Sequence, residues 1–184
     1  MPPESYSELI GRLQDGENFS FYHFYGHKQK HPRRIDRSCF SQWFHCPFKI
    51  DGIHYPTAEH WMMAEKARLF ADFDTLELIL TAPDPKTAKQ LGRSVKNFNS
   101  DVWSSSCFDI VVRGNVAKFG QNEEILHFLQ ATGNDVMVEA AANDSIWGIG
   151  LSVRDANAHS PEHWRGQNLL GFALNATRRI LSMK

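Results

Sequence analysis

The first long helix of this chain is predicted from the stretch Tyr55-Pro56-Thr57-Ala58-Glu59-His60-Trp61-Met62-Met63-Ala64-Glu65-Lys66. Thr57 is a suitable N-cap, so the helix is expected to begin there and to run to about Phe70. Positions i, i+3, i+4 and i+7 share one helix face, which places Glu59 and Lys66 at the two ends of an apolar stripe. Charges on a core-facing stripe need partners, and a ligand pocket supplies them. The alternative is an ordinary amphipathic helix from which both charged groups reach solvent.

The residues before this helix predict a β-hairpin, because Pro47–His54 places apolar positions on both sides of the pair Asp51-Gly52. Further helices are expected at residues 4–15, 72–80, 85–91, 102–119, 123–130 and 168–183, and strands at 19–25 and 136–138. Arg178, Arg179 and Lys184 suit the C-terminus of the last helix. The chain is therefore expected to form a compact single domain that is mainly α with a few short β-strands (α+β).

Composition limits the classes of function. The chain has 184 residues, of which 42% are hydrophobic and 22% charged, as expected for a globular domain with a substantial core. The formal net charge of -1 argues against general attraction to polyanions, so nucleic acid would need a local basic patch. One such patch is the predicted loop 27–37, which contains Lys28, Lys30, Arg33, Arg34 and Arg37 against the single acid Asp36.

The sequence predicts no membrane partner and no metal site. It opens with no signal-peptide pattern, and no run of about eighteen apolar residues could span a bilayer. A cytoplasmic protein is expected, with a nuclear location as the alternative. The cysteines Cys39, Cys46 and Cys107 are odd in number and lack zinc-ligand spacing, so neither a disulfide framework nor bound zinc is expected.

A second polar stretch runs from Asn143 through Asp144 and Trp147 to Gly148, and is followed later by Trp164–Gly171. Glycine permits close approach of the backbone, while a carboxylate beside an indole ring suits a ribose or a nucleobase. The alternative is a capped turn, because Asn, Asp and Ser are good capping residues and Trp usually packs inward.

The order of these pieces resembles the NADAR (NAD and ADP-ribose) family, also called YbiA-like, from about Phe24 to Arg178. The resemblance rests on Phe40-Ser41-Gln42-Trp43-Phe44, Asp51-Gly52, Tyr55–His60, Lys66, Leu91-Gly92-Arg93, Asn143-Asp144, Trp147-Gly148 and Gly166–Gly171. It implies a mainly helical YbiA-like domain over residues 19–184, preceded by a helix and extension over residues 1–18. The stretch Ser160–Asn168 is similar to the longer-loop branch of the family.

The resemblance implies an N-glycosidase that hydrolyses the bond between ribose C1 and a base or heterocyclic amine. Its substrate would be a nucleotide-like small molecule, either an ADP-ribose conjugate of guanine or a ribosylaminopyrimidine phosphate of riboflavin biosynthesis. An ADP-ribosylated nucleic acid is a further partner to consider. The reaction requires no cofactor. The rival class is a binding module that holds ADP-ribose or NAD without hydrolysing it.

The resemblance also assigns the site residues. Glu59 is expected to act near ribose C1 as a base or an electrostatic stabiliser if the helix dipole keeps it ionised, or as an acid if burial raises its pKa. Asp144 is the second catalytic candidate, orienting the ribose hydroxyls or the water. The expected substrate-binding residues are Phe24, Trp43, Phe44, Lys66, Arg93, Asn143, Trp147, Gly148 and Asn168. Arg113 is a further candidate for binding phosphate, unless it faces water.

Overall fold

A computed structural model describes residues 1–183 of the chain, which contain seven α-helices and four short strands. The mainly helical fold with a few strands is therefore confirmed. The chain divides into two compact units. We call Gln42–Glu123 the central unit, and Met1–Ser41 together with the described residues from Glu124 onward the terminal unit. Within residues 1–183, no helix has both the length and the apolar character needed to cross a bilayer.

The central unit begins with a β-hairpin and continues with helices. Its elements are β2 (Phe48–Ile50), β3 (Ile53–Tyr55), α2 (Ala58–Leu69), α3 (Phe73–Leu80), α4 (Pro85–Arg93) and α5 (Ser100–Gly120). In the hairpin, Phe48 pairs with Tyr55 and Ile50 with Ile53. Asp51 and Gly52 both have positive φ, at 51° and 82°, as an Asp-Gly type I′ turn requires. The predicted hairpin is confirmed.

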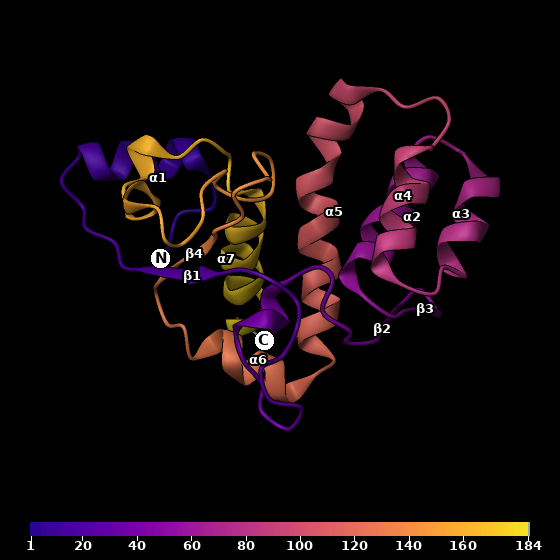
Figure 1. Ribbon diagram of the computed structural model, residues 1–184, viewed down its shortest axis with the longest axis horizontal. Coiled ribbons are helices and arrows are strands. Elements are labelled where there is room, and N and C mark those ends of the chain that lie inside the picture. The colour runs from indigo at the N-terminus through magenta and orange to yellow at the C-terminus, as the bar shows by residue number, and fades with distance from the viewer. Residues whose placement is uncertain (184) are drawn as a thin grey trace. The chain divides into compact units, whose positions relative to one another are not determined.

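Helix α2 is the core of the central unit, where it packs against α3, α4 and α5 (Figure 1). The Thr57 hydroxyl caps its N-terminus by accepting a hydrogen bond from the His60 amide. Seven consecutive residues, Ala58–Ala64, are buried. The prediction of a single apolar stripe was therefore too narrow, because α2 is covered by neighbours around its first two turns.

Two glycines let the neighbouring helices approach α2. A Cβ atom on Gly92 of α4 would lie 2.0 Å from Met63 Sδ, and one on Gly114 of α5 would lie 2.2 Å from Trp61 Cδ1. Both distances are far below van der Waals contact. The Trp61 indole also donates a hydrogen bond of 2.7 Å to the Ile110 carbonyl of α5. The helix spacing around α2 thus depends on the missing side chains at these two glycines.

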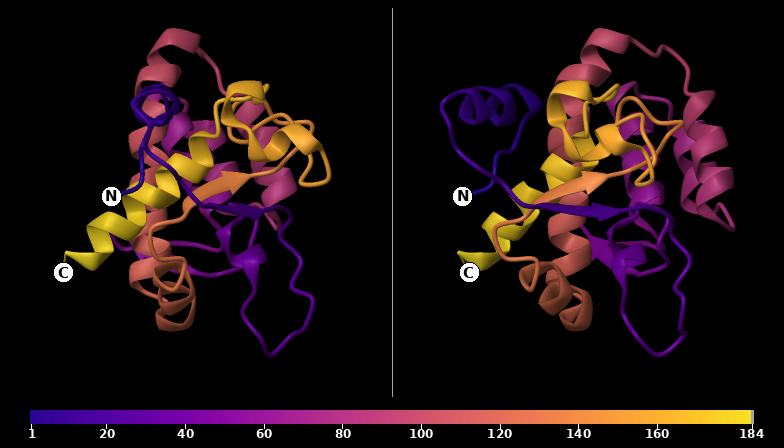
Figure 2. Two further views of the ribbon diagram at one scale, coloured as in Figure 1. Left: turned by 90° about the vertical axis from the view of Figure 1, so that its left-hand side faces the viewer. Right: turned by 60° about the vertical axis from the view of Figure 1, so that its left-hand side comes forward.

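The terminal unit is built on a two-stranded parallel sheet. Its elements are α1 (Tyr6–Gln14), β1 (Phe21–Phe24), η1 (Arg37–Phe40), α6 (Glu123–Gln130, from its second residue), β4 (Val136–Glu139), η2 (Ala156–His159), η3 (Pro161–His163) and α7 (Leu169–Ser182). Strand β1 pairs with β4 from Phe21 opposite Val136 to Phe24 opposite Glu139. Helix α7 packs against β4, and Figure 2 shows it beside the strand pair.

Two asparagines bind the edge of β4 that faces away from β1. The Asn168 carboxamide accepts from the Glu139 amide at 2.9 Å and donates to the Met137 carbonyl at 2.9 Å. The Asn175 side chain accepts from the Met137 amide at 3.1 Å. Gly171 completes this contact, because a Cβ there would lie 2.1 Å from the Met137 carbonyl oxygen. Side-chain amides therefore satisfy the backbone groups that a third strand would otherwise bind.

All predicted helices and strands are present, with ends that differ by a few residues. The short 3₁₀ turns η1, η2 and η3 were not predicted. Arg178 and Arg179 lie close to the end of α7, as predicted, but the partners of the Arg178 side chain were not predicted. Arg178 is buried and donates to the Thr132 hydroxyl and, at 2.7 Å, to the Asp135 carbonyl. Lys184 lies outside the described residues.

We predict that Gly114→Ala destabilises the protein because the new methyl group overlaps Trp61. The overpacking should lower the free energy of unfolding by about 1–3 kcal/mol, measured by urea denaturation. Gly11→Ala is the matched control, since Gly11 lies within α1 and a Cβ there meets nothing within 4 Å. The control should gain about 0.5–1 kcal/mol from helix propensity. Equal stabilisation by the two substitutions would show that Trp61 does not limit the approach of α5.

Candidate functional site

Glu59 lies in the first turn of α2 and is 2% exposed. Its backbone amide donates to the Gln42 carbonyl at 3.0 Å, which ties the start of the helix to the segment that contains Trp43 and Phe44. The positive end of the helix dipole favours the ionised form of a carboxylate at this position. The site thus has a buried carboxylate on a backbone that is bound to the preceding segment.

His60, the next residue, fixes the geometry of this turn. Its Nε2 lies 3.1 Å from the Ala82 carbonyl, and its Nδ1 lies 2.8 Å from the Thr57 hydroxyl. A carbonyl oxygen only accepts, so Nε2 carries the proton and Nδ1 accepts from Thr57. Burial lowers the pKa of His60, which favours this neutral form. His60 therefore joins the helix cap to the end of α3 without adding charge beside Glu59.

Gln42 forms hydrogen bonds through its side chain as well as through its backbone. Its Oε1 accepts from Asn115 Nδ2 of α5 at 3.0 Å, and the same amide nitrogen donates to the Val111 carbonyl at 2.9 Å. Gln42 and Asn115 are both buried. The polar link from Glu59 through Gln42 thus ends on the longest helix of the central unit.

Lys66 occupies an aromatic and cationic corner of the central unit. Its Nζ lies 4.2 Å from the ring centroid of Phe98 and 5.6 Å from that of Trp103. Burial and, second, the nearby Arg93 guanidinium lower the pKa of the Lys66 ammonium. Neither cation forms an ion pair with any residue from 1 to 183. Two neighbouring cations without an acidic partner attract anions.

Trp43 and Phe44 also lie next to cationic groups. Lys89 Nζ of α4 is 5.8 Å from the Trp43 ring centroid, and the buried Lys118 Nζ of α5 is 5.8 Å from that of Phe44. Trp43 is half-buried and Phe44 is buried. Trp43 therefore exposes part of its ring to a ligand, whereas the ring of Phe44 is enclosed by other residues.

Arg113, a predicted phosphate ligand, contacts other residues of the central unit. Its guanidinium binds the Asp51 carboxylate of the hairpin turn at 2.7 Å and lies 5.1 Å from the Trp61 ring centroid. These contacts connect α5 with the hairpin and with α2. The structure gives Arg113 a role in packing within the central unit.

Asp144 organises the polar turn of the terminal unit. Its Oδ1 accepts from the amides of Ile146 at 3.0 Å and Trp147 at 2.8 Å. These hydrogen bonds form the capped turn that the sequence allows as the alternative to a site for ribose or a nucleobase. Oδ2 makes no hydrogen bond within residues 1–183, and the residue is half-buried. One carboxylate can therefore hold the turn with one oxygen and present the other to a ligand.

The same turn is packed tightly by backbone contacts. A Cβ on Gly166 would lie 2.3 Å from the Gly148 carbonyl, and one on Gly148 would lie 2.9 Å from the Glu139 carbonyl. Gly148 also accepts a hydrogen bond from the Asn168 amide at 3.0 Å. Asn168 is 0% exposed and its carboxamide is bound to β4, so its side chain supports the turn instead of presenting a free polar group.

The predicted site residues thus form one group in each unit. The central unit brings Glu59, Lys66, Arg93, Trp43 and Phe44 onto α2, α4 and the segment that precedes the hairpin. In the terminal unit, Asn143, Asp144, Trp147, Gly148 and Asn168 lie in or beside one turn. Phe24 is also in the terminal unit, buried at the end of β1 and edge-to-face with Phe40 at 5.5 Å.

Sequence reasoning missed Phe98 and Trp103, the two rings beside Lys66. The available signal was one aromatic residue in the loop after Arg93 and another in the first turns of the next helix. Nothing in their spacing from Lys66 predicts the contact, because it depends on how α2 and α5 pack.

A family model described as the NADAR domain matches residues 23–182, which includes most of both units. The chain belongs to the NADAR family. One NADAR domain therefore spans the two units, in agreement with the predicted single domain. The two groups of site residues are consequently parts of the same family domain.

Several proteins of similar sequence are named N-glycosidases. An N-glycosidase of Acanthamoeba polyphaga mimivirus is 43% identical over 144 residues, covering 76% of this chain and 85% of that protein. The N-glycosidase YbiA of Escherichia coli strain K12 is 32% identical, covering 81% of this chain and 82% of that protein. The NMR structure of the E. coli protein YbiA matches with a TM-score of 0.72 and 28% identity, covering 91% of this chain and 88% of YbiA.

We predict that Arg93→Gln raises the pKa of the Lys66 amine toward its ordinary value. The reason is electrostatic, because the Arg93 charge disfavours the protonated form of Lys66. The measurement is an NMR pH titration of the lysine side-chain signals. Lys86→Gln, at the other end of the same helix, should leave the Lys66 titration unchanged. An unaltered pKa in the Arg93 variant would show that the two cations do not interact.

Proposed function

We propose that this NADAR protein hydrolyses the N-glycosidic bond between ribose C1 and a base or heterocyclic amine. The relatives named N-glycosidases support a hydrolase that acts on N-glycosyl bonds. ADP-ribosylated guanine is the first candidate substrate, and a ribosylaminopyrimidine phosphate of riboflavin biosynthesis is the second. The observation that carries the proposal is the buried carboxylate of Glu59 in the first turn of a rigidly capped helix.

Glu59 is the proposed catalytic carboxylate. As the C1–N bond breaks, positive charge develops on C1 and the ring oxygen, and a nearby ionised carboxylate stabilises that charge. A water molecule then supplies the oxygen that binds C1, with Glu59 as base, and the departing base takes up a proton. The helix dipole favours the ionised form required for this role. No cofactor takes part in this reaction.

Asp144 is the proposed partner for the sugar. Its Oδ2 is free of the hydrogen bonds that hold the turn, so it is available to accept from the vicinal hydroxyls of ribose or from the attacking water. Asn143, an exposed neighbour in the same turn, adds an amide to this polar surface. The half-buried ring of Trp147 adjoins the turn and offers a surface for stacking on a base.

Lys66 and Arg93 are the proposed ligands for phosphate oxygens. Their two positive charges lack acidic partners in the described chain, and a phosphate would relieve the repulsion between them. A diphosphate needs more positive charge than a single phosphate ester. The basic segment 28–37 and the long loop that ends at Asn168 therefore favour the ADP-ribosyl substrate over the smaller sugar phosphate.

We predict that Glu59→Gln lowers hydrolysis by about 10²–10⁴-fold, because an amide neither stabilises the developing cation nor activates water. Ligand affinity should be largely retained, since the substitution preserves shape. Turnover is followed by the release of free base, and affinity by calorimetry with ADP-ribose. Glu77→Gln, on the exposed face of α3, is the control and should keep full activity.

The Glu59 variant also separates the enzyme from the rival class. Undiminished hydrolysis in Glu59→Gln would rule out Glu59 as the catalytic carboxylate. Binding of ADP-ribose or NAD without turnover by the wild-type protein would instead identify a binding module.

The substrate is decided by offering the purified protein guanosine-linked ADP-ribose and a ribosylaminopyrimidine phosphate in parallel. We expect release of guanosine and ADP-ribose from the first compound, detected by mass spectrometry, because its diphosphate can use both Lys66 and Arg93. Arg93→Gln should raise the KM for this substrate more than it lowers kcat. Cleavage of the aminopyrimidine compound alone would assign the protein to the second substrate class.

A further inference from the structure

Residues 28–37, which we call the basic loop, concentrate positive charge on a chain whose formal net charge is -1. All five of its cationic side chains are exposed. None of them forms an ion pair within residues 1–183. Even the diphosphate of an ADP-ribosyl substrate does not require five cations in addition to Lys66 and Arg93. The basic loop thus has charge to offer to a second ligand group.

The single acid of the basic loop does not neutralise it. Asp36 Oδ1 accepts from the Ser38 amide at 2.9 Å, and Oδ2 accepts from the Lys30 amide at 2.9 Å. Both carboxylate oxygens are therefore used to shape the backbone of the loop. The Arg37 guanidinium donates to the His23 carbonyl at 3.2 Å, which holds it against β1 while leaving it exposed.

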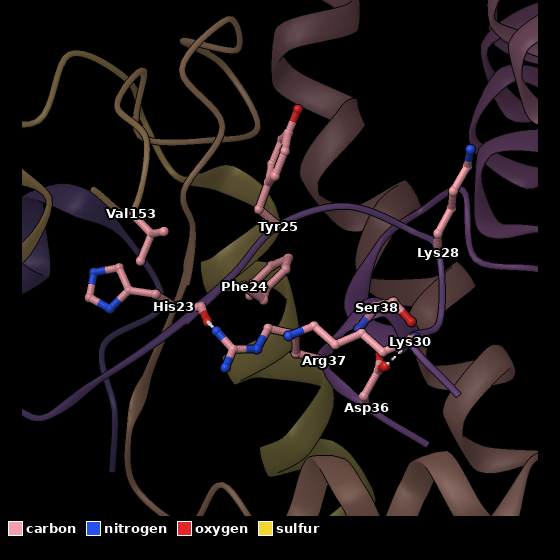
Figure 3. Close-up of a pocket in the computed structure, with 9 residues that line it drawn as sticks. All are labelled: His23, Phe24, Tyr25, Lys28, Lys30, Asp36, Arg37, Ser38 and Val153. Atoms are coloured by element: carbon pink, nitrogen blue, oxygen red, sulfur yellow. Dashed lines mark hydrogen bonds between the residues drawn. The ribbon is translucent and has the colours of Figure 1, made fainter. Parts of the chain in front are cut away.

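Two hollows of the terminal unit meet at Lys30, Asp36 and Arg37. The first has a volume of about 380 Å³ and is also lined by His23, Phe24, Tyr25, Lys28, Ser38 and Val153. Figure 3 shows Lys30 and Arg37 extending into this hollow below Phe24. The second has a volume of about 290 Å³, and Tyr22, His31, Arg34, Ile35 and Phe128 complete its lining. Adjacent hollows that share two cations suit a ligand with repeated negative charges.

The first hollow has a further group that suits a nucleotide unit. Tyr25 stands at its rim, is 66% exposed, and points away from Lys30 and Arg37 in Figure 3. An exposed tyrosine ring can stack on a base. The hollow thus combines cations with an aromatic face.

We propose that the basic loop and its two hollows bind single-stranded nucleic acid, with phosphodiester groups on Lys30, Arg34 and Arg37 and a base on Tyr25. A single strand fits better than a duplex, because stacking on Tyr25 requires an unpaired base and the loop presents no helix for the major groove. The inference rests on the proposed function in one respect, since the strand would carry the ADP-ribosylated base. Its test needs no bond cleavage.

The test measures binding of the full-length protein to an unmodified, fluorescently labelled single-stranded oligonucleotide by anisotropy over a series of salt concentrations. Each phosphate contact contributes about 0.7 to the slope of log K against log salt. Lys30→Gln with Arg34→Gln should therefore reduce the slope by about 1.4 and weaken binding at low salt. Tyr25→Ala should weaken binding about 5- to 150-fold with the slope unchanged.

The control pair is Lys49→Gln with Lys86→Gln. Both lysines are exposed in the central unit, and the two substitutions remove the same amount of charge as the basic-loop pair. This pair should retain the wild-type affinity and slope. The proposal is overturned if the basic-loop pair binds like the wild type, if both pairs lose affinity equally, or if a duplex or a mononucleotide binds as tightly as the strand. Glu59→Gln should bind the strand normally, so a failure of the proposed hydrolysis would leave this result intact.

Discussion

The close packing of α2 against α4 and α5 is the constraint on which the central unit depends. Gly92 and Gly114 bring the neighbouring backbones against Met63 and Trp61, at distances that no other residue permits. This packing buries the first two turns of α2 on every side. A carboxylate in such a helix is held in one place at a considerable desolvation cost. The position of Glu59 is thus a consequence of helix packing as much as of its own contacts.

In the terminal unit, hydrogen bonds from side-chain amides fix the position of the polar turn. Asn168 and Asn175 bind β4 in the way that a neighbouring strand would, and α7 is thereby fixed against the sheet. The turn that contains Asp144 follows β4, and its carbonyls accept backbone hydrogen bonds from the residues at the start of α7. The polar turn is therefore attached to a rigid element, which is the condition for orienting a sugar.

The sequence was sufficient to predict the helices, the hairpin and the cap at Thr57, because each has a strong local signal. It also identified Glu59, Lys66 and Asp144 as candidates. It did not predict that Phe98 and Trp103 surround Lys66, nor that the Asn168 amide is bound to β4. These contacts join residues that are distant in sequence, and hydrophobic periodicity holds no information about them. The partners of Arg178 were not predicted for the same reason, since Thr132 and Asp135 lie in the turn between α6 and β4.

The asparagine contacts on β4 have a consequence for solubility during folding. A two-stranded sheet has open edges, and an edge with unpaired amides and carbonyls can recruit a strand from another molecule. The Met137 amide and carbonyl and the Glu139 amide are already bound by side chains of α7 and its N-cap. Docking of α7 therefore closes this edge of a strongly apolar strand, and a chain whose last helix is displaced would expose it to aggregation.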